Sequence, residues 1–208
     1  KKIQNLLLYV KKNYTKSFFF VNFFINFFIS FISKKHISKI SKHNTIKKFL
    51  IKDSVFIETG CYYGETLEKF YKYFIKSYSI EPSLYLHNIT SKRLKENRSI
   101  EIINGTSEDK FENIIKSNLK YDLTLWLDGH FSSGETYKNN IYSSLDHEIN
   151  IIKKYLENIK NISVMIDDVH LFNGRNGYPE INKILNYFKS QNFRISIENN
   201  ILIAKKIY

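Results

Sequence analysis

The stretch SVFIETGCYYGET, residues 54–66, decides the fold of this chain. A short apolar run ending at Ile57 leads into two glycines, Gly60 and Gly64, and then into residues that favour a helix. A strand, a glycine turn and a helix in this order open the ligand-binding edge of a doubly wound α/β domain. Glycine is needed where the backbone turns tightly and approaches a ligand without a Cβ. The same glycines would also suit a simple strand-to-helix connection.

Three later segments place a polar residue directly after an apolar run. Glu81 follows Ser-Tyr-Ser-Ile, Asp128 and His130 lie in Trp-Leu-Asp-Gly-His, and Asp167 and Asp168 follow Val-Met-Ile. Parallel strands end at one edge of their sheet, and doubly wound folds bind ligands there. We therefore expect these side chains to gather at the edge that carries the glycine turn.

From residue 53 the sequence alternates between strand and helix patterns. We expect strands at about 54–58, 77–81, 99–103, 122–127 and 162–166, with helices at about 65–76, 84–96, 108–118, 141–158 and 179–190. Two further β runs, 193–197 and 201–205, are joined only by Glu-Asn-Asn, which is short enough for a hairpin and therefore for an antiparallel pair. The prediction is an α/β domain over 53–208 with five parallel strands and a C-terminal antiparallel hairpin.

The net charge of +12 belongs to the first 52 residues. These contain twelve lysines and no Asp, Glu or Arg, which leaves 20 basic and 20 acidic residues in the remaining 156. A formally neutral domain argues against a broad nucleic-acid surface on it, whereas a basic leader suits contact with an acidic partner. The single cysteine, Cys61, excludes an internal disulfide, suits a reducing compartment and is expected to fill space in the turn.

The leader, 1–52, is expected to be a helical extension with an apolar segment at 17–33. Asn22, Asn26 and Ser30 recur every four residues there and form one narrow polar stripe on a helix. Its apolar part, about 15 residues or roughly 22 Å, is shorter than the ~30 Å hydrocarbon core. We expect a helix at a membrane surface, on the inner face of a membrane around the cytoplasm. The alternatives are packing on the domain or on a second subunit in a homodimer, and a spanning segment.

The layout, the ETGCYYGET turn, Glu81 and the closing hairpin together resemble the Rossmann-like, class I S-adenosylmethionine (SAM)-dependent methyltransferases. The resemblance covers about 53–208. The segments WLDGHFSSGET, 126–136, and MIDDVHLF, 165–172, resemble the branch of metal-dependent O-methyltransferases that act on sugars and natural products. One departure is Tyr62, which stands where the commoner motif has a third glycine.

The resemblance implies a set of donor-binding residues along the strand ends. Glu81 would accept hydrogen bonds from the ribose hydroxyls, and the glycine turn would approach the methionine moiety. Glu58 would orient the loop or meet the ammonium of the donor, although it also suits a helix-capping acid. Ser107 would bond adenine, cap the following helix, or do both. The whole set is Glu58, Gly60, Tyr62, Gly64, Thr66, Glu81, Ser107 and Asp128.

A magnesium site at Asp128, Asp167 and Asp168 is the second implication of the resemblance. Clustered carboxylates raise one another's pKa unless a cation neutralises them, and magnesium prefers oxygen ligands. The alternative is that only Asp168 is functional, with Asp167 a strand-end acid, and some members of the branch need no metal.

His130, beside Asp128, is the predicted catalytic base, because an imidazole accepts protons near neutral pH. His170 is the rival base, and 132–136 would form a lid over the substrate. The predicted function is O-methyl transfer to a hydroxyl of a sugar or glycosylated metabolite. The alternatives are a nucleic-acid methyltransferase and a non-catalytic, membrane-tethered binding module. A nicotinamide dehydrogenase is disfavoured by the glycine spacing and by the terminal hairpin.

Overall fold

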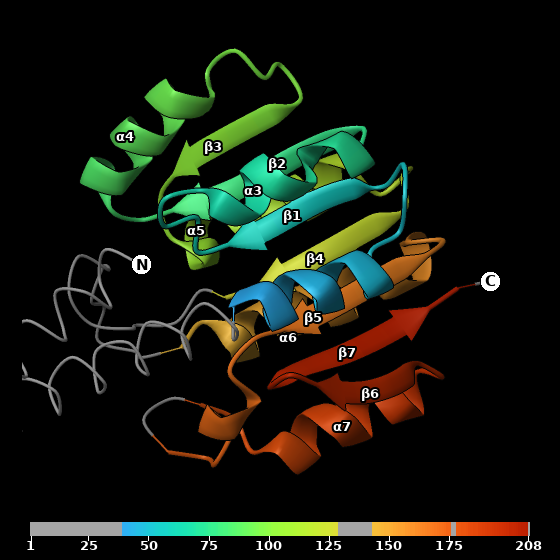
Figure 1. Ribbon diagram of the computed structural model, residues 1–208. Helices are drawn as coiled ribbons and strands as arrows, with labels where there is room; N and C mark the ends of the chain where they lie inside the picture. Colours follow the sequence, from blue (N-terminus) through green and yellow to red (C-terminus); the bar gives the residue numbers. More distant parts are fainter. Residues whose placement is uncertain (1–38, 129–142, 176–177, 208) are drawn as a thin grey trace, which may run out of the picture. The chain divides into compact units, whose positions relative to one another are not determined.

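The computed structural model describes residues 39–128, 143–175 and 178–207. They build one seven-stranded sheet in the order β3-β2-β1-β4-β5-β7-β6 (Figure 1). The strands are β1 (Val55–Thr59), β2 (Lys76–Glu81), β3 (Ile100–Asn104), β4 (Leu123–Leu127), β5 (Ile162–Ile166), β6 (Arg194–Glu198) and β7 (Ile201–Lys206). The first five pair in parallel, whereas β7 lies antiparallel between β5 and β6. The sheet therefore consists of the five expected parallel strands and the expected hairpin.

Strand order reverses direction between β1 and β4. The chain runs from β1 outward through β2 to β3, then returns to the other side of β1 and runs outward through β4 to β5. Ligands of open α/β sheets bind outside the carboxyl ends of the strands at such a switch point. A ligand site is therefore expected among the residues that follow β1, β2, β4 and β5.

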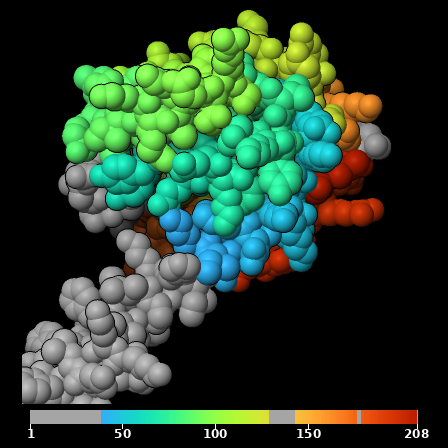
Figure 2. Space-filling model, turned by 45° about the horizontal axis from the view of Figure 1, so that its top comes forward, coloured from blue at the N-terminus to red at the C-terminus, as the bar shows by residue number. Residues whose placement is uncertain are grey.

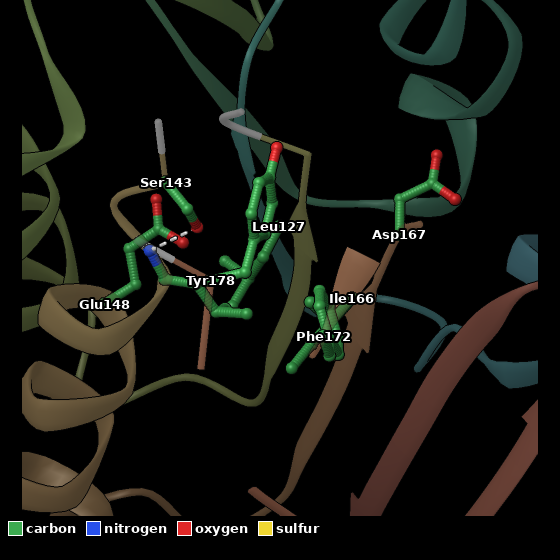
Figure 3. Close-up of a pocket in the computed structure, with 8 residues that line it drawn as sticks. Leu127, Ser143, Glu148, Ile166, Asp167, Phe172 and Tyr178 are labelled. Carbon is green, nitrogen blue, oxygen red and sulfur yellow. Dashed lines mark hydrogen bonds between the residues drawn. The ribbon is translucent and has the colours of Figure 1, made fainter. Parts of the chain in front are cut away.

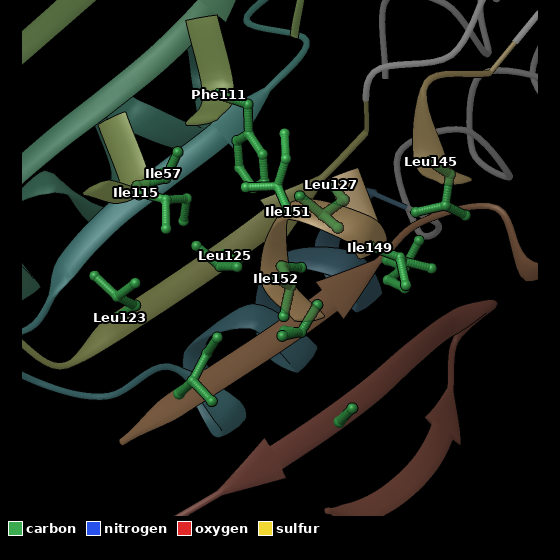
Figure 4. Packing of buried hydrophobic residues seen from close by; sticks show 14 of the residues in the cluster. Ile57, Phe111, Ile115, Leu123, Leu125, Leu127, Leu145, Ile149, Ile151 and Ile152 are labelled. Atoms are coloured by element: carbon green, nitrogen blue, oxygen red, sulfur yellow. The ribbon is translucent and has the colours of Figure 1, made fainter. Parts of the chain in front are cut away.

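Helices cover both faces of the sheet. They are an N-terminal helix at 39–49, α3 (Glu65–Phe70), α4 (Leu84–Leu94), α5 (Ser107–Ser117), α6 (Leu145–Tyr155) and α7 (Ile181–Ser190). Strand residues alternate between the two faces, so Val55 and Ile57 pack with α5, α6 and α7 while Phe56 packs with α3 and α4. Figure 4 shows Leu123, Leu125 and Leu127 of β4 facing the apolar side chains of α5 and α6.

A two-residue turn closes the β6–β7 hairpin. Asn199 and Asn200 both adopt left-handed backbone conformations, with φ of 52° and 66°. Positive φ at both central positions matches the right-handed twist of the strands, and asparagine tolerates it better than most residues. The turn therefore sets the register in which β6 and β7 pair.

The sheet-bearing compact unit begins at His43, within the N-terminal helix. Ile46 is buried, the Phe49 carbonyl accepts a 2.8 Å hydrogen bond from Ser163 Oγ, and His43 lies edge-on to Phe70 of α3. Figure 2 shows this helix, in blue, against the cyan residues of the α3 region. The sequence predicts the domain boundary after residue 52. In the structure, residues from His43 onward already belong to the compact unit.

The apolar segment 17–33 lies outside the described residues, and its membrane or dimer contacts stay predictions. Across 39–128, 143–175 and 178–207, no helix combines the length and apolar character needed to cross a membrane.

Candidate functional site

The turn after β1 requires its glycines. Gly60 and Gly64 have φ of 88° and 70°, in the left-handed region that favours glycine. A Cβ on Gly64 would lie 2.5 Å from Cγ2 of Thr90 in α4, well inside van der Waals contact. The sequence-predicted glycine turn is therefore a close approach between the β1 loop and α4.

Most of the main-chain N–H groups in this turn are already hydrogen-bonded to protein acceptors. Gly60 and Cys61 donate to the Ile80 carbonyl (3.0 and 3.2 Å), Tyr62 donates to Glu81 Oε2 (2.8 Å) and Gly64 donates to the Cys61 carbonyl (2.8 Å). Phosphate-binding turns instead direct such N–H groups at the ligand. These internal hydrogen bonds hold the turn in shape and use N–H groups that a phosphate would need.

Glu81, at the end of β2, joins the loops that follow β1 and β2. Its side chain is buried, and Oε2 accepts the Tyr62 N–H while Oε1 accepts the Ser83 N–H at 2.9 Å. Burial raises the pKa of this carboxyl above its usual value, and the backbone hydrogen bonds oppose that rise. A carboxylate oxygen can accept more than one hydrogen bond. Glu81 can therefore hold both loops and still accept bonds from a pair of ligand hydroxyls.

Glu58 lies beneath the turn rather than on its surface. Only 1% of the residue is exposed, and Oε2 accepts a 2.6 Å hydrogen bond from Ser79 Oγ. Burial raises its pKa to about 8; the hydroxyls of Ser79 and Thr66 lower it, and the charges of Asp128 and Glu81 raise it. This geometry suits the loop-orienting role among those expected for Glu58.

Carboxyl groups at the ends of β1, β2 and β4 therefore interact electrostatically. Asp128 directly follows β4, and its N–H donates to the carbonyl of Thr59, the last residue of β1, at 3.1 Å. Like charges so close together raise one another's pKa and favour a bound cation. The structure brings together the glycine turn, Glu58, Glu81 and Asp128, as the sequence predicts.

Ser107 is the first residue of α5 rather than its N-cap. The N-cap is Thr106, whose Oγ1 donates to Asp109 Oδ2 at 3.0 Å, so the expectation that Ser107 caps the helix is wrong. The Ser107 side chain is buried, and its hydroxyl lowers the pKa of Glu148 through hydrogen bonding. Its predicted contact with adenine stays a prediction.

At the ends of β4 and β5, Asp128 and Asp168 lie close enough to the phenol of Tyr178 to influence it. The Asp167 N–H donates to the Leu127 carbonyl at 3.1 Å, which ties the two strand ends together. Burial raises the pKa of the Tyr178 phenol, and the charges of Asp168 and Asp128 raise it further. Asp128 and Asp168 therefore lie within electrostatic reach of one phenol, although they follow different strands.

The three aspartates do not form the metal-ligand set that the resemblance implies. Asp167 is buried and its Oδ1 accepts the Asp168 N–H at 2.8 Å. Asp168 has a left-handed backbone, and its Oδ1 accepts a 3.0 Å bond from Asn200 Nδ2. Within the described ranges, no three His, Cys, Asp or Glu side chains are grouped so that they could hold a metal ion. Magnesium stays a prediction without support from this arrangement.

Asn200 of the hairpin turn also holds His170. Its Oδ1 accepts the His170 main-chain N–H at 3.0 Å, so its Nδ2 faces Nδ1 of the His170 ring, 2.8 Å away. Nδ1 then accepts this bond, which places the ring proton of neutral His170 on Nε2. His130 and the lid residues 132–136 lie outside the described residues.

Sequence reasoning missed Glu148, a buried acid in α6. Its Oε1 accepts a 2.8 Å bond from Ser144 Oγ, and burial raises its pKa to about 7. It lines a small cavity of about 10 Å³, room for about one water molecule, at the ends of β4 and β5 (Figure 3). The lining residues are Leu127, Ser143, Leu145, Glu148, Ile166, Asp167, Phe172 and Tyr178. A usable signal existed, because Glu148 lies three residues from Leu145 and four from Ile152, on the apolar face of its helix.

No family model and no curated protein sequence matches the chain. Several solved structures superpose on it. Precorrin-6y C5,15-methyltransferase from Geobacter metallireducens superposes with a TM-score of 0.53 at 11% identity, over 79% of this chain and 85% of that one. The N-methyltransferase NodS from Bradyrhizobium japonicum gives 0.52 at 10%, over 81% and 94%. A Streptococcus mutans protein assigned as a methyltransferase, in complex with S-adenosylhomocysteine (SAH), gives 0.50 at 15%, over 79% and 93%.

The chain therefore shares the Rossmann-like α/β fold of these proteins. Its own sheet is mostly parallel and seven-stranded, with an antiparallel terminal hairpin. At these identities it concerns the fold, and the reaction has to be argued from the site.

Proposed function

We propose that the chain binds SAM and transfers its methyl group to a hydroxyl of a sugar or glycosylated metabolite. The observation that carries the proposal is the pair of acids Glu81 and Asp128 beside a turn whose main-chain N–H groups are mostly engaged by protein acceptors. Such a site suits a ligand with a ribose diol and positive charge, and it repels a pyrophosphate. SAM has a ribose, an ammonium and a sulfonium, whereas a nicotinamide dinucleotide has two phosphates.

In this proposal, each residue at the donor side has a separate task. Glu81 accepts hydrogen bonds from the ribose hydroxyls. It does so through the lone pairs that the Tyr62 and Ser83 N–H groups do not occupy. Glu58 keeps the turn in shape through Ser79, and Asp128 adds negative charge beside the cation. The donor supplies a methyl group already activated by the positive sulfur, so the protein has mainly to position the reactants and accept one proton.

The pocket at the ends of β4 and β5 supports a hydroxylated acceptor. Ser143, Glu148, Asp167 and Tyr178 line this small cavity with donors and acceptors, which suits contact with a hydroxyl group better than with an apolar group. The acceptor oxygen forms a bond to the methyl carbon, the carbon–sulfur bond breaks with its electron pair going to sulfur, and the hydroxyl proton goes to the base. His130 remains the predicted base, because it lies two residues beyond Asp128 and because Nδ1 of His170 is engaged by Asn200.

Calorimetry tests the donor half of this proposal. Wild-type protein is expected to bind SAM and SAH and to give no heat with NAD⁺. Glu81→Gln should weaken both adenosyl ligands at least about tenfold, because hydrogen bonds to a charged group are lost. Glu101→Gln, an exposed β3 acid paired with Lys76 at 3.0 Å, is the matched control and should bind as wild type does. Binding of NAD⁺ without SAM would overturn the proposal.

A methyl-transfer assay tests the acceptor half. Labelled SAM is incubated with sugar nucleotides, glycosylated metabolites, RNA and DNA, and the label in each fraction is counted. We expect label in a sugar fraction, with loss of turnover in His130→Ala. Label in nucleic acid would favour the rival methyltransferase, and SAM binding without transfer to any class would favour a binding module.

A further inference from the structure

Tyr62 combines an unfavourable backbone conformation with a firmly held position. Its φ is 50°, in the left-handed region that non-glycine residues adopt at some cost. Its N–H nevertheless donates to Glu81 Oε2 at 2.8 Å, and its carbonyl accepts a 3.0 Å bond from Thr90 Oγ1. The main chain of Tyr62 is therefore held from both β2 and α4. Glycine would accept this conformation without strain, so the ring needs a separate reason.

The ring of Tyr62 is not used to fill the core. The residue is 51% exposed, and the ring packs edge-on against Tyr63 with centroids 4.6 Å apart. Of the seven large hydrophobic side chains exposed in the part of the chain that the structure describes, Tyr62, Leu84 and Tyr85 belong to the two loops that Glu81 joins or to the helix start just beyond them. Exposed aromatic surface beside a buried acid is typical of a ligand site rather than of a solvated loop.

Charge and distance indicate which part of a ligand the ring would meet. The carboxyls of Glu81 and Asp128, both close enough to act on buried Glu58, make the surroundings negative, and an aromatic face next to acids favours a cation. In SAM the sulfonium is bonded to C5′, the carbon attached to the ribose ring. Glu81 would hold the hydroxyls of that ribose. The Tyr62 nitrogen is 2.8 Å from a Glu81 oxygen, so the Tyr62 side chain begins beside the group that would hold the ribose.

We propose that Tyr62 is a donor-selectivity residue: its ring contacts the sulfonium of bound SAM and makes the site prefer SAM over SAH. The inference rests on the proposed function, because it needs an adenosyl donor at Glu81. SAM and SAH differ by the methyl group and the positive charge on sulfur, so an aromatic face should discriminate between them. Preference for the charged form would help the spent product to leave after each transfer.

The test measures the dissociation constants of SAM and SAH by calorimetry for wild type, Tyr62→Phe and Tyr62→Leu. Phe keeps an aromatic face and should keep the ratio of the two constants. Leu should weaken SAM about two- to fivefold, as expected for an exposed cation–π contact, and change SAH less than twofold. Tyr62→Gly, which relieves the left-handed strain, should fold at least as stably and lose the same preference. Tyr71→Leu, at an ordinary backbone position, is the matched control and should leave the ratio unchanged.

Two results would overturn the inference, and they differ from each other. If Tyr62→Leu and Tyr62→Gly weaken the binding of SAM and SAH equally, or weaken neither, the ring does not discriminate between them by the charge on sulfur. The proposed function would then still stand. If wild-type protein binds neither ligand, the proposed function fails and the inference fails with it.

Discussion

The two halves of the candidate site are built in different ways. At the ends of β1 and β2, the donor half is held by main-chain groups: Glu81 accepts N–H groups from two loops, and the glycine turn bonds to the Ile80 carbonyl. At the ends of β4 and β5, the acceptor half is held by side chains from distant segments. Asn200 bonds Asp168 and His170 there, and Glu148 reaches the pocket from α6.

This difference explains where specificity can change. A main-chain framework tolerates side-chain replacement but fails when its backbone conformation is altered, whereas a side-chain network fails residue by residue. Loops with varied side chains on a constant scaffold are the usual route by which one fold acquires different substrates. We therefore expect the donor half to depend on its backbone and on the Glu81 carboxylate that holds it, and the acceptor half to depend on several side chains.

The largest effect is expected for Gly64→Ala. Alanine at a φ of 70° is strained by about 1–2 kcal/mol, and its Cβ would lie 2.5 Å from Thr90 Cγ2, which adds about 1–3 kcal/mol of overpacking. Denaturant unfolding should report this loss, and calorimetry should report no SAM binding. Gly174→Ala, also left-handed but facing only the flexible Glu180 side chain, is the control that should keep donor binding. Normal SAM affinity in Gly64→Ala would contradict the main-chain account.

Stability should fall as pH rises, because each half buries an acid. The pKa of Glu148 is raised from 4.5 to about 7, so the unfolded chain ionises first between those values while the folded protein keeps the proton. Wild type should lose roughly 3 kcal/mol across this window, and Glu148→Gln should not. At pH 8 the variant should therefore be more stable than wild type, with little difference at pH 4. The pKa of Glu58, raised to about 8, extends the wild-type loss of stability to about pH 8, and Glu58→Gln should remove that part.

The check is urea unfolding of wild type and both variants between pH 4 and 9. Glu101→Gln, on the exposed side of β3, serves as the control for a Glu-to-Gln change and should follow the wild-type curve. A Glu148→Gln curve that falls in parallel with wild type would show that this carboxyl is not the source of the pH dependence.

The sequence predicts the donor half well because its signals are local. Glycines before a helix and an acid after an apolar run each act within a few residues, and both features are present in the structure. The acceptor half depends on contacts between residues far apart in the chain. Asn200 looks like an ordinary turn residue in the sequence, yet it holds Asp168 and His170, 32 and 30 residues away.

Asn200→Gly should separate positioning from folding in the acceptor half. Glycine keeps the left-handed turn, but the change removes the bonds to the Asp168 carboxylate, the His170 ring and the His170 N–H. We expect methyl transfer to fall about tenfold or more, as for other outer-shell hydrogen-bond partners, with SAM affinity unchanged. Asn199→Gly is the matched control: it removes a 2.8 Å bond to Thr45 Oγ1 instead and should keep its turnover. Equal rates in the two variants would remove Asn200 from the site.

The smallest effect is expected for Cys61→Ala in the donor turn. Cys61 is 4% exposed, and burial raises the pKa of its thiol well above the usual value, so little thiolate forms at neutral pH. Its N–H bond to the Ile80 carbonyl does not depend on the side chain. The variant should lose about 1 kcal/mol of stability for the sulfur removed and bind SAM within twofold of wild type. Fast alkylation of the native thiol, or loss of donor binding in the variant, would show that this side chain does more than fill space and that the donor half is not a main-chain framework alone.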